Sequence, residues 1–479
     1  MGKKIALLGF GVENISVAKF LLKHKIDFEI LDKAPVEELT DDGQELIKAQ
    51  NLKIRTGDDY LSNLADYNFI IRSPGIPCLT PEIQAARLPK PGTGGQAKLS
   101  GSEITSSTKL FLDWCPAKII GITGTKGKGT TASLIFSILK KAQSSPVSPG
   151  RSQGGKLKVQ SYGNVYLIGN IGIASFDIIE EVKPNDLVVF ELSSFQIQDL
   201  SRSPHITVVT NLTDDHLDYH QTLEEYRATK QTVLKYQNEN DYAILNQDYP
   251  ECYKLKEYGK AKKYFFSSHE KTNGAYVNLS GDVILTINGE KKICGQNEIK
   301  LIGRHNLENI AAATIVGEIL EVPINDIHQA VINFGGLEHR LEFVREVSDV
   351  KFYNDSFSTN PTPTIAAIRS FSEPITIILG GSKKGAQFHK LAKEIQKSTV
   401  NNIILIGVES PRIRKSLEEA NIDAKIIEGE RDIKLIIDQA LNLATKGSIV
   451  LFSPACASFD MFKNYKDRGE KFKAEVAKL

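Results

Sequence analysis

The stretch Lys118-Ile-Ile-Gly-Ile-Thr-Gly-Thr-Lys-Gly-Lys-Gly-Thr-Thr131 decides the fold class of this 479-residue chain. Its apolar beginning, Ile119 to Ile122, predicts a short buried strand, and residues 132–139 (ASLIFSIL) predict a helix. Glycines in the turn between them let backbone N–H groups approach an anion, and the helix N-terminus adds a partial positive charge. Because Lys128 can reach the outer phosphates of a nucleotide, this order of strand, loop and helix predicts a phosphate-binding loop.

The expected ATP contacts in this loop are seven consecutive residues. They are Gly124, Thr125, Lys126, Gly127, Lys128, Gly129 and Thr130. The pattern departs from the standard P-loop, because Gly121 lies one residue too early and Gly129 stands where a hydroxyl residue normally follows the lysine. Thr130 is then the nearest hydroxyl for Mg²⁺. The alternative is a glycine-rich turn that binds nothing.

Composition narrows the class of protein. With 41% hydrophobic and 24% charged residues the chain is ordinary for a globular protein, and its length predicts about three domains of roughly 150 residues each. A net charge of +1 gives no support for binding to nucleic acid or to a membrane surface. Five scattered cysteines without a CxxC pair indicate neither a disulfide framework nor a zinc site. Without an apolar stretch long enough for a signal peptide or a membrane span, the cytoplasm is the expected location.

Strands that alternate with helices predict three α/β domains, each with a mostly parallel sheet flanked by helices. The expected domains are a Rossmann-like one (1–112), a central P-loop ATPase-like one (113–335) and a second Rossmann-like one (336–479). The first boundary follows a stretch rich in Gly, Pro, Ser and Thr (87–108), and the second lies at Gly335-Gly336. Residues 144–158 are polar and predict a flexible surface insertion.

The N-terminal domain begins with a strand, a Gly9-Phe-Gly11 turn and a helix to about Lys23. A second strand ends at Asp32, about where a dinucleotide-binding fold places its ribose ligand. The third glycine of that fingerprint is missing, since Asn14 occupies its place. A nucleotide bound at the switch point of the sheet is expected, and NAD binding by an oxidoreductase is an alternative.

In the central domain, chemically active side chains follow predicted strands or lie on predicted helices. Glu191 ends a strand and suits Mg²⁺, which prefers oxygen ligands, whereas a solvated glutamate is the alternative. His216 follows the next strand and could bind or orient a metal, although a single histidine is more often structural. Lys230 lies on the apolar face of a helix over 223–234, where burial would favour a neutral amine; a salt-bridged structural lysine is equally expected.

Two asparagines precede a predicted alanine-rich helix over 311–320. Asn306 and Asn309 share a helical face and carry both donors and acceptors, which suits the edge of a purine. A role in capping that helix is at least as well supported by the local pattern.

Taken in order, these stretches resemble the Mur ligase family, the ATP-dependent amide-forming enzymes of peptidoglycan precursor synthesis. The resemblance spans nearly the whole chain and is closest to the members that add D-glutamate to UDP-N-acetylmuramoyl-L-alanine. The motifs that carry it are Gly9-Phe-Gly11, Ser73-Pro-Gly-Ile76, Gly124 to Thr131, Gly169-Asn-Ile-Gly172, Glu191-Leu-Ser-Ser-Phe-Gln196, Asp215-His216, Tyr226 to Lys230, Gly303 to Asn309, Glu338-His-Arg340, Asn354-Asp-Ser356, Leu379-Gly-Gly381 and Ser453-Pro-Ala-Cys-Ala-Ser-Phe-Asp460.

The resemblance implies roles for single residues. In the ATP and metal sites, Lys128 and Thr130 would hold phosphates and Mg²⁺, Glu191 and His216 would belong to the metal site, and Lys230 would be carbamylated to support a magnesium ion. The further residues implied for ATP are Asn306, Asn309, Arg340 and Asp355. Those implied for the UDP-muramoyl substrate are Gly9, Gly11, Asp32, Ser73 and Asn170. Those implied for D-glutamate are Thr359, Lys384, Ser458 and Phe459, with Lys384 also counted among the catalytic residues beside Lys128, His216 and Lys230.

The implied reaction passes through an acyl-phosphate that the D-glutamate amine attacks, with ATP and Mg²⁺ as cofactors and a monomer expected. Two positions depart from the family pattern: Gly129 replaces the hydroxyl residue, and Phe357 stands where the D-glutamate enzymes often have a lysine. A relative that adds another amino acid, a folylpolyglutamate-synthase-like enzyme and a non-catalytic nucleotide-binding protein are the alternatives.

Overall fold

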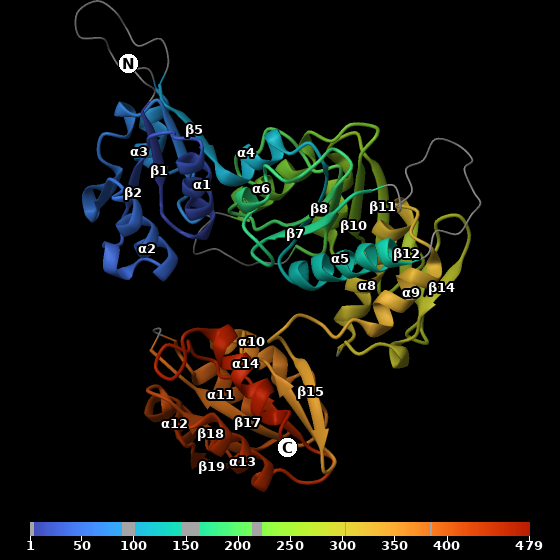
Figure 1. The fold of residues 1–479 in the computed structure, drawn as a ribbon. Helices are drawn as coiled ribbons and strands as arrows, with labels where there is room; N and C mark the ends of the chain where they lie inside the picture. The colour runs from blue at the N-terminus through green and yellow to red at the C-terminus, as the bar shows by residue number, and fades with distance from the viewer. Residues whose placement is uncertain (1–3, 89–100, 146–161, 213–222, 302, 384–385) are drawn as a thin grey trace, which may run out of the picture. The chain divides into compact units, whose positions relative to one another are not determined.

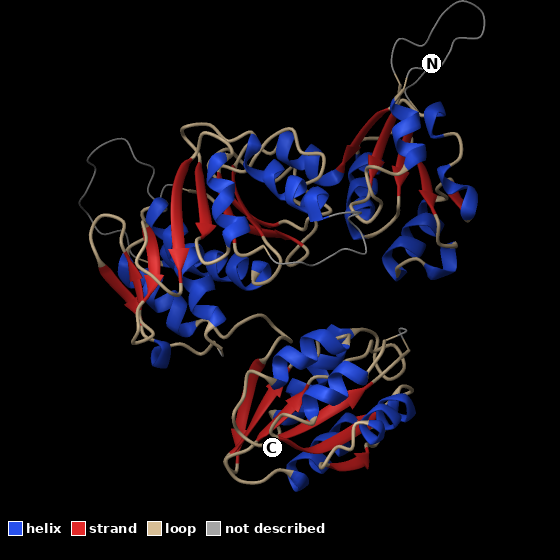
Figure 2. Cartoon of the chain, turned by 180° about the vertical axis from the view of Figure 1, so that it is seen from behind, coloured by secondary structure: helices blue, strands red, loops and turns tan. Residues whose placement is uncertain are grey.

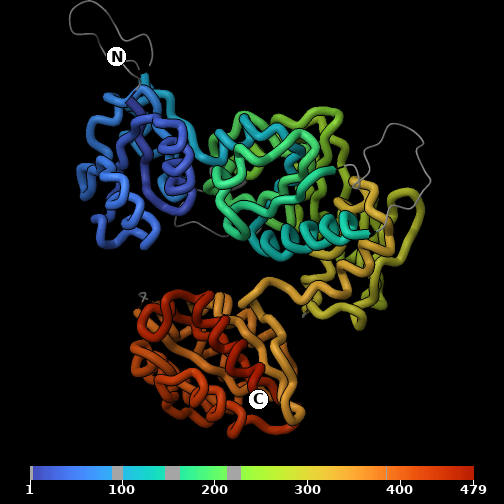
Figure 3. Tube along the Cα trace, viewed as in Figure 1, coloured from blue at the N-terminus to red at the C-terminus, as the bar shows by residue number. Residues whose placement is uncertain are grey.

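The computed structural model contains three α/β domains in chain order, each built on its own sheet (Figure 1). It describes residues 4–88, 101–145, 162–212, 223–301, 303–383 and 386–479, except the side chains of 223–227. By compactness the chain divides into two units, Met1–Ile299 with Arg304–Asn333 and Lys300–Gly303 with Phe334–Leu479, so the first unit holds two of the three sheets. The trace runs from the N-terminal domain in blue through the central domain in green and yellow to the C-terminal domain in red (Figure 3). The predicted three-domain α/β fold is confirmed.

The N-terminal sheet has the strand order β3-β2-β1-β4-β5, and all of its strands are parallel. Its strands are β1 (Ile5–Leu8), β2 (Glu29–Asp32), β3 (Ile54–Thr56), β4 (Phe69–Arg72) and β5 (Glu103–Ser106), and its helices are α1 (Val12–Lys23), α2 (Asp41–Gln50) and α3 (Pro81–Arg87). The order reverses between β1 and β4, which places a ligand-binding switch point at their carboxyl ends. β5 was not expected, because its polar sequence lies within the stretch that predicted a domain boundary.

The central sheet has nine strands in the order β14-β13-β12-β11-β10-β9-β6-β8-β7. The strands from β12 to β7 run parallel, whereas β13 and β14 are antiparallel at one edge. The strands are β6 (Lys118–Thr123), β7 (Val165–Gly169), β8 (Leu187–Glu191), β9 (Ile206–Val209), β10 (Tyr242–Asn246), β11 (Lys262–Ser267), β12 (Gly274–Val277), β13 (Val283–Leu285) and β14 (Lys291–Cys294). Because β6 lies between β8 and β9, the phosphate loop after β6 is flanked by Glu191 and by the residues that follow Val209.

Two helices of the central domain, α5 and α8, begin earlier than the sequence indicated, whereas α6 begins at residue 223 as predicted. The helices of this domain are α4 (Ser107–Trp114), α5 (Lys128–Ser144), α6 (Leu223–Lys235), α7 (Pro250–Tyr253), α8 (His305–Ile319) and α9 (Ile324–Asn333). α5 begins at Lys128 rather than at residue 132, and α8 begins at His305 rather than at residue 311. The sequence pattern missed the polar first turns of both helices. The predicted limit after residue 112 falls within α4, and the predicted domain limits stay predictions.

In the C-terminal domain, a six-stranded sheet in the order β15-β16-β20-β17-β18-β19 has helices on both faces (Figure 2). Only β15 is antiparallel to its neighbour. The strands are β15 (Glu342–Val347), β16 (Val350–Asn354), β17 (Ile375–Gly380), β18 (Val400–Ile406), β19 (Lys425–Glu428) and β20 (Ile449–Phe452), and the helices are α10 (Pro361–Ile368), α11 (His389–Ile395), α12 (Ser410–Glu419), α13 (Ile433–Leu443) and α14 (Tyr465–Val476). Alternate residues of β17 enter different cores: Ile377 packs with α10 to α12, and Ile378 packs with α13 and α14. Burial on both faces explains why this strand reads as an unbroken apolar run.

Within the first unit, aromatic side chains connect the N-terminal and central domains. Trp114 lies at the end of α4, 6.2 Å from Phe20 of α1 and 5.9 Å from Phe176 between ring centroids. Phe176 belongs to the short helix η5 (Ser175–Asp177), whose Asp177 accepts a hydrogen bond of 2.6 Å from Ser16. Among the helices that the structure describes, none has the length and apolar character required to cross a membrane.

Candidate functional site

The phosphate loop runs from the end of β6 into the first turn of α5. Gly127 is the N-cap of α5 with φ of +80°, and no side chain caps this helix end. The first turn of a helix carries N–H groups without intrahelical partners, so this end can accept an anion. Lys128 is folded back over the loop, and its Nζ donates to the carbonyls of Gly124 and Thr125 at 3.0 Å each. The lysine therefore lies at the loop that the sequence assigned to phosphate.

The residues that follow β9 hold this loop in place. Asn211 accepts the Lys126 N–H at Oδ1 (2.8 Å), and its backbone carbonyl accepts the Thr125 N–H (2.9 Å). The Thr210 hydroxyl donates to the Lys126 carbonyl at 2.6 Å. The sequence did not indicate this role of Thr210 and Asn211, because their partners in the loop lie 84 and 85 positions away.

Two glycines of the loop are required by close neighbours. A Cβ atom at Gly124 would lie 2.0 Å from Thr210 Oγ1, and one at Gly127 would lie 2.5 Å from Asn309 Oδ1. Both positions also have positive φ angles, which favour glycine. The loop is therefore enclosed between the end of β9 and helix α8.

The hydroxyls at the start of α5 differ in their surroundings. Thr131 is buried and donates to Asn309 Oδ1 at 3.1 Å, whereas Thr130 is half-buried. The Asn309 amide donates in turn to Asn306 Oδ1 at 2.9 Å. Since both asparagines lie inside α8, with Arg304 as its N-cap, the alternative that they cap this helix is wrong. Thr130 stays the candidate metal ligand, and purine contact by the asparagines stays a prediction.

Glu191 is buried at the end of β8, beside the end of β7. A Cβ atom at Gly169 would lie 2.2 Å from the Glu191 carbonyl oxygen, and the φ of Gly169 is +114°. Glycine therefore permits the two strand ends to approach, and it brings the exposed Asn170 next to the acidic residue. This arrangement agrees with a metal-binding acid close to a substrate-binding amide.

Lys230 is fully buried, and its Nζ donates to the Thr123 hydroxyl at 2.7 Å. Burial holds the pKa of this lysine well below its ordinary value, and the nearby positive charge of Lys128 lowers it further, while Cys252 and Glu191 act in the opposite direction. The Thr123 hydroxyl in turn donates a hydrogen bond to the Leu192 carbonyl at 2.9 Å. The surroundings of Lys230 thus favour the neutral form of its amine, and its carbamylation stays a prediction.

The donor set near the loop suits Mg²⁺. The Glu191 carboxylate and the Thr130 hydroxyl are hard oxygen donors, and a carbamate on Lys230 would supply another. His216, the other predicted member of this site, lies outside the described residues. The residues present therefore fit a magnesium ion, with Lys230 contributing only after modification.

At the N-terminal switch point, the turns after β1 and β4 lie against each other. A Cβ atom at Gly9 would lie 2.8 Å from Ser73 Cβ, and the Ser73 N–H donates to the Leu8 carbonyl at 2.7 Å. Asp32 accepts the Phe10 N–H at 2.6 Å, so this acid binds the turn that contains the exposed Gly11. The structure thus brings together Gly9, Gly11, Asp32 and Ser73, as a substrate-binding role requires.

Two polar residues at this switch point received no role from the sequence. Asn14, in the place of the third glycine, is buried and donates to the carbonyls of Gly9 (2.7 Å) and Ile71 (3.1 Å), so it ties the turn to β4. Glu13 accepts from Ser175 at 3.1 Å and from Gln196 at 3.3 Å. Gln196 lies five residues after Glu191, in the loop that follows β8. The hydrogen bond between Gln196 and Glu13 therefore connects this loop with the turn at the start of α1.

In the C-terminal domain, the predicted ATP residues lie at the carboxyl end of β16. Asp355 is buried and accepts hydrogen bonds from the hydroxyls of Ser358 (2.5 Å) and Ser453 (2.6 Å) and from the Leu341 N–H (3.1 Å). Burial raises the pKa of Asp355 to about 6 despite these hydrogen bonds. Arg340 is exposed, and its guanidinium carbon lies 4.4 Å from the centroid of the Phe357 ring.

The predicted D-glutamate residues lie on loops after β16 and β20. Ser458 is buried, Thr359 is half-buried, and Phe459 is exposed with its N–H donating to Ser382 Oγ at 3.1 Å. Lys384 lies outside the described residues. Sequence reasoning missed the buried Arg468 of α14, which donates to the Ser356 carbonyl (2.8 Å) and the Cys456 carbonyl (3.1 Å) and so joins the two loops.

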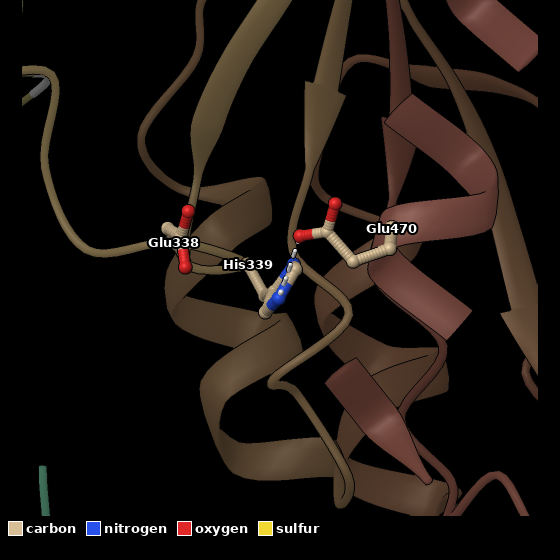
Figure 4. Close-up of side chains that lie close together, drawn as sticks. All are labelled: Glu338, His339 and Glu470. Carbon is tan, nitrogen blue, oxygen red and sulfur yellow. Dashed lines mark ion pairs between the residues drawn. The ribbon is translucent and has the colours of Figure 1, made fainter. Parts of the chain in front are cut away.

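A second cluster of potential metal ligands in this domain proves to be a structural ion-pair network. His339 lies between Glu338 and Glu470, all three close together (Figure 4). The Asn354 amide contacts His339 Nδ1 at 3.0 Å, and His339 Nε2 lies 3.5 Å from Glu470 Oε1, so both ring nitrogens already have protein partners. The Lys473 ammonium lies 2.9 Å from Glu470 and already supplies a cation.

Comparisons with known proteins cover nearly the whole chain. Family models described as "Mur ligase MurD-like, N-terminal domain", "Mur ligase middle domain" and "Mur ligase, glutamate ligase domain" match residues 3–90, 122–317 and 339–456. The chain is 35% identical to the UDP-N-acetylmuramoylalanine--D-glutamate ligase of Clostridium tetani and 36% identical to that of Clostridium novyi, over 100% of this chain and 97% of each relative.

Solved structures show the same fold at low sequence identity. The UDP-N-acetylmuramate-alanine ligase MurC of Thermotoga maritima matches with a TM-score of 0.57 at 18% identity, covering 100% of both chains. The MurF ligase of Thermotoga maritima in complex with ADP matches with a TM-score of 0.53 at 17% identity, covering 99% of this chain and 95% of that one.

Proposed function

The chain belongs to the Mur ligase family, and on that premise we propose that it uses ATP to join D-glutamate to UDP-N-acetylmuramoyl-L-alanine in peptidoglycan precursor synthesis. The observation that carries this function is the match to D-glutamate ligases over the full length, including the C-terminal domain that is expected to bind the amino acid. An ATP-dependent ligase also accounts for the phosphate loop at β6 and α5.

The chemistry explains why ATP is required. A carboxylate has no leaving group, so an amine does not displace its oxygen in water. Transfer of the γ-phosphoryl group to the L-alanine carboxylate releases ADP and gives an acyl-phosphate. The D-glutamate nitrogen then attacks the carbonyl carbon, loses a proton, and expels inorganic phosphate as the amide forms. Water must be excluded meanwhile, because it would hydrolyse the acyl-phosphate.

In the central domain, the first turn of α5 and Lys128 would bind the ATP phosphates and offset the charge that develops during transfer. Thr130, Glu191 and a carbamylated Lys230 would hold Mg²⁺, together with His216. When bound, Mg²⁺ supplies charge neutralisation at the phosphate oxygens. Asn306 and Asn309 would serve the nucleotide base, with Arg340 and Asp355 also contributing to ATP binding.

The remaining predicted residues would bind the other substrates. The UDP group would occupy the switch point at Gly9, Gly11, Asp32 and Ser73, and Asn170 would contact the muramoyl group. Thr359, Lys384, Ser458 and Phe459 would bind D-glutamate, whose two carboxylates require a cation such as Lys384. A cytoplasmic location and a monomeric state stay predictions.

Measurement of ADP release with UDP-N-acetylmuramoyl-L-alanine and a panel of amino acids tests this function. We expect release to depend on D-glutamate and to fall at least about a hundredfold in Lys128→Ala, since a cation at the transferred phosphoryl group is lost. Lys141→Ala, at the exposed other end of α5, is the matched control. Release with no preference for D-glutamate would contradict the proposed substrate, and ATP binding without release would favour a non-catalytic protein.

A further inference from the structure

Phe357 lies two residues after Asp355, at the position where the D-glutamate enzymes often have a lysine. Its side chain is 36% exposed, and the Arg340 guanidinium carbon is 4.4 Å from the ring centroid, well within the range of a cation–π interaction. We propose that Phe357 is a positioning residue that holds the Arg340 side chain in a fixed orientation for ATP binding. This inference rests on the proposed role of Arg340 in ATP binding.

The backbone fixes the distance between the two residues. The Phe357 N–H donates to the His339 carbonyl at 2.9 Å, and the Leu341 N–H donates to the Asp355 carboxylate at 3.1 Å. Arg340 therefore lies between two residues that are each bonded to the Asp355–Phe357 segment. These hydrogen bonds place the backbone of Arg340 beside Phe357. The contact between the guanidinium and the ring therefore follows from the local fold.

An aromatic neighbour, Tyr465, limits the orientation of the Phe357 ring. Tyr465, the first residue of α14, meets the ring edge to face at 5.1 Å and an interplanar angle of 88°, and it meets the His339 ring similarly at 6.1 Å. His339 is held by Asn354 and by Gly469, where a Cβ atom would lie 2.2 Å from the imidazole. The phenyl group thus contacts the half-buried Tyr465, which in turn meets the buried His339, and it presents its face to the guanidinium.

The chemistry of the phenyl ring determines what it adds to Arg340. A phenyl face attracts the guanidinium through its quadrupole and adds no charge of its own. A lysine at residue 357 would instead place a second cation beside Arg340. In this chain, one stacked arginine supplies the positive charge at this position.

The test is equilibrium ATP binding and steady-state kinetics of Phe357→Leu, Phe357→Tyr and the control Phe343→Leu. Phe343 is a similarly exposed phenylalanine of the same domain, but its ring packs 5.5 Å from Tyr353. We expect Phe357→Leu to raise the Kd and KM for ATP about two- to fivefold, with kcat and the KM for D-glutamate within a factor of two. Phe357→Tyr keeps an aromatic face and should therefore retain the wild-type Kd and KM for ATP. Phe343→Leu should also leave both constants unchanged.

A double-mutant cycle with Arg340→Ala isolates the pair. If Phe357 acts through Arg340, Phe357→Leu has no further effect on ATP binding in the Arg340→Ala background. An equal effect in both backgrounds, or a rise in the KM for D-glutamate instead of ATP, would overturn the inference. Because ATP binding is measured without turnover, an inactive wild-type enzyme would refute the proposed function but leave this test intact. Thermal melting of each variant excludes unfolding, and should Phe357→Leu unfold, the same cycle with Phe357→Met decides.

Discussion

Lys230 and Thr123 lie 107 positions apart in the sequence, yet the lysine ammonium nitrogen and the threonine hydroxyl are 2.7 Å apart. Thr123 is the last residue of β6, directly before the phosphate loop, so the contact anchors α6 at the candidate metal site. Burial lowers the pKa of Lys230, which favours the neutral form of the amine, the form that reacts with CO₂. The reaction forms an N–C bond and releases the proton of the amine.

Carbamylation of Lys230 should therefore be detectable. In buffer freed of CO₂, we expect activity to fall and to recover on addition of bicarbonate. With ¹³C-bicarbonate, a carbamate resonance should appear in the wild type and be absent in Lys230→Ala. Lys235→Ala, in the exposed last turn of the same helix, should keep the resonance. A wild-type protein that is fully active without CO₂ and shows no resonance would contradict this assignment.

Asn211→Ala should weaken ATP binding, because Asn211 holds the phosphate loop through the Lys126 N–H and carbonyl. Loss of these hydrogen bonds costs about 1–1.5 kcal/mol, or roughly a tenfold higher Kd for ATP. Isothermal titration with ATP measures this. Asn238→Ala removes a similar turn hydrogen bond far from the loop, at the start of β10, and should leave the Kd unchanged. Equal Kd values for both variants would show that Asn211 does not support the loop.

Gly169→Ala should destabilise the first unit, because the new Cβ atom would lie 2.2 Å from the Glu191 carbonyl oxygen. A forced shift of two buried strand ends costs about 2–4 kcal/mol in the free energy of unfolding. Gly289→Ala has a comparable positive φ but open space, so strain alone should cost about 1 kcal/mol. Urea denaturation followed by tryptophan fluorescence compares them, and similar losses in both variants would argue against steric contact with Glu191.

Asp355 should make the stability of the C-terminal domain depend on pH. Its folded-state pKa, raised to about 6 by burial, lies above the unfolded value, so the unfolded chain loses this proton first as pH rises. The contribution of the Asp355 carboxyl to the free energy of unfolding is therefore greatest below about pH 4. It falls by about 3 kcal/mol as the pH rises to well above 6.

The Asp355→Asn variant lacks this titration. Urea denaturation followed by circular dichroism at pH 4 and pH 7 should show that the wild type loses about 2.4 kcal/mol relative to the variant over this range. If the two proteins change in parallel, the carboxyl is ionised in the folded state at both pH values, and the raised pKa is wrong.

Regular strands were predictable, whereas contacts between distant residues were not. β6 contains the strand that was expected over Ile119 to Ile122, because a short apolar run between polar residues indicates a buried strand. β5 was missed, since the polar Glu103–Ser106 becomes a strand only by pairing with β4. The start of α8 was missed because its first turn is polar, although Asn306 and Asn309 are buried.

In the candidate functional site, too, local patterns were predictable and contacts between distant residues were not. Glycines and Lys128 have a local pattern that indicates a phosphate loop, and the inward position of Lys230 follows from helical spacing. Asn211 and Arg468 have no such signal, because their bonded partners lie 85 and 112 positions away. The need for glycine at residue 169 likewise depends on Glu191, which only the folded sheet brings close.

Trp114 is the single tryptophan of the chain, and it packs against Phe20 of the N-terminal domain and Phe176 of the central domain while remaining about half exposed. Its emission spectrum is therefore an intrinsic optical probe of the boundary between these two domains. Any ligand that loosens the aromatic cluster will move the emission to longer wavelengths, without a dye or a label. If the proposed UDP-containing substrate changes this cluster when it binds, the emission of one residue reports its binding.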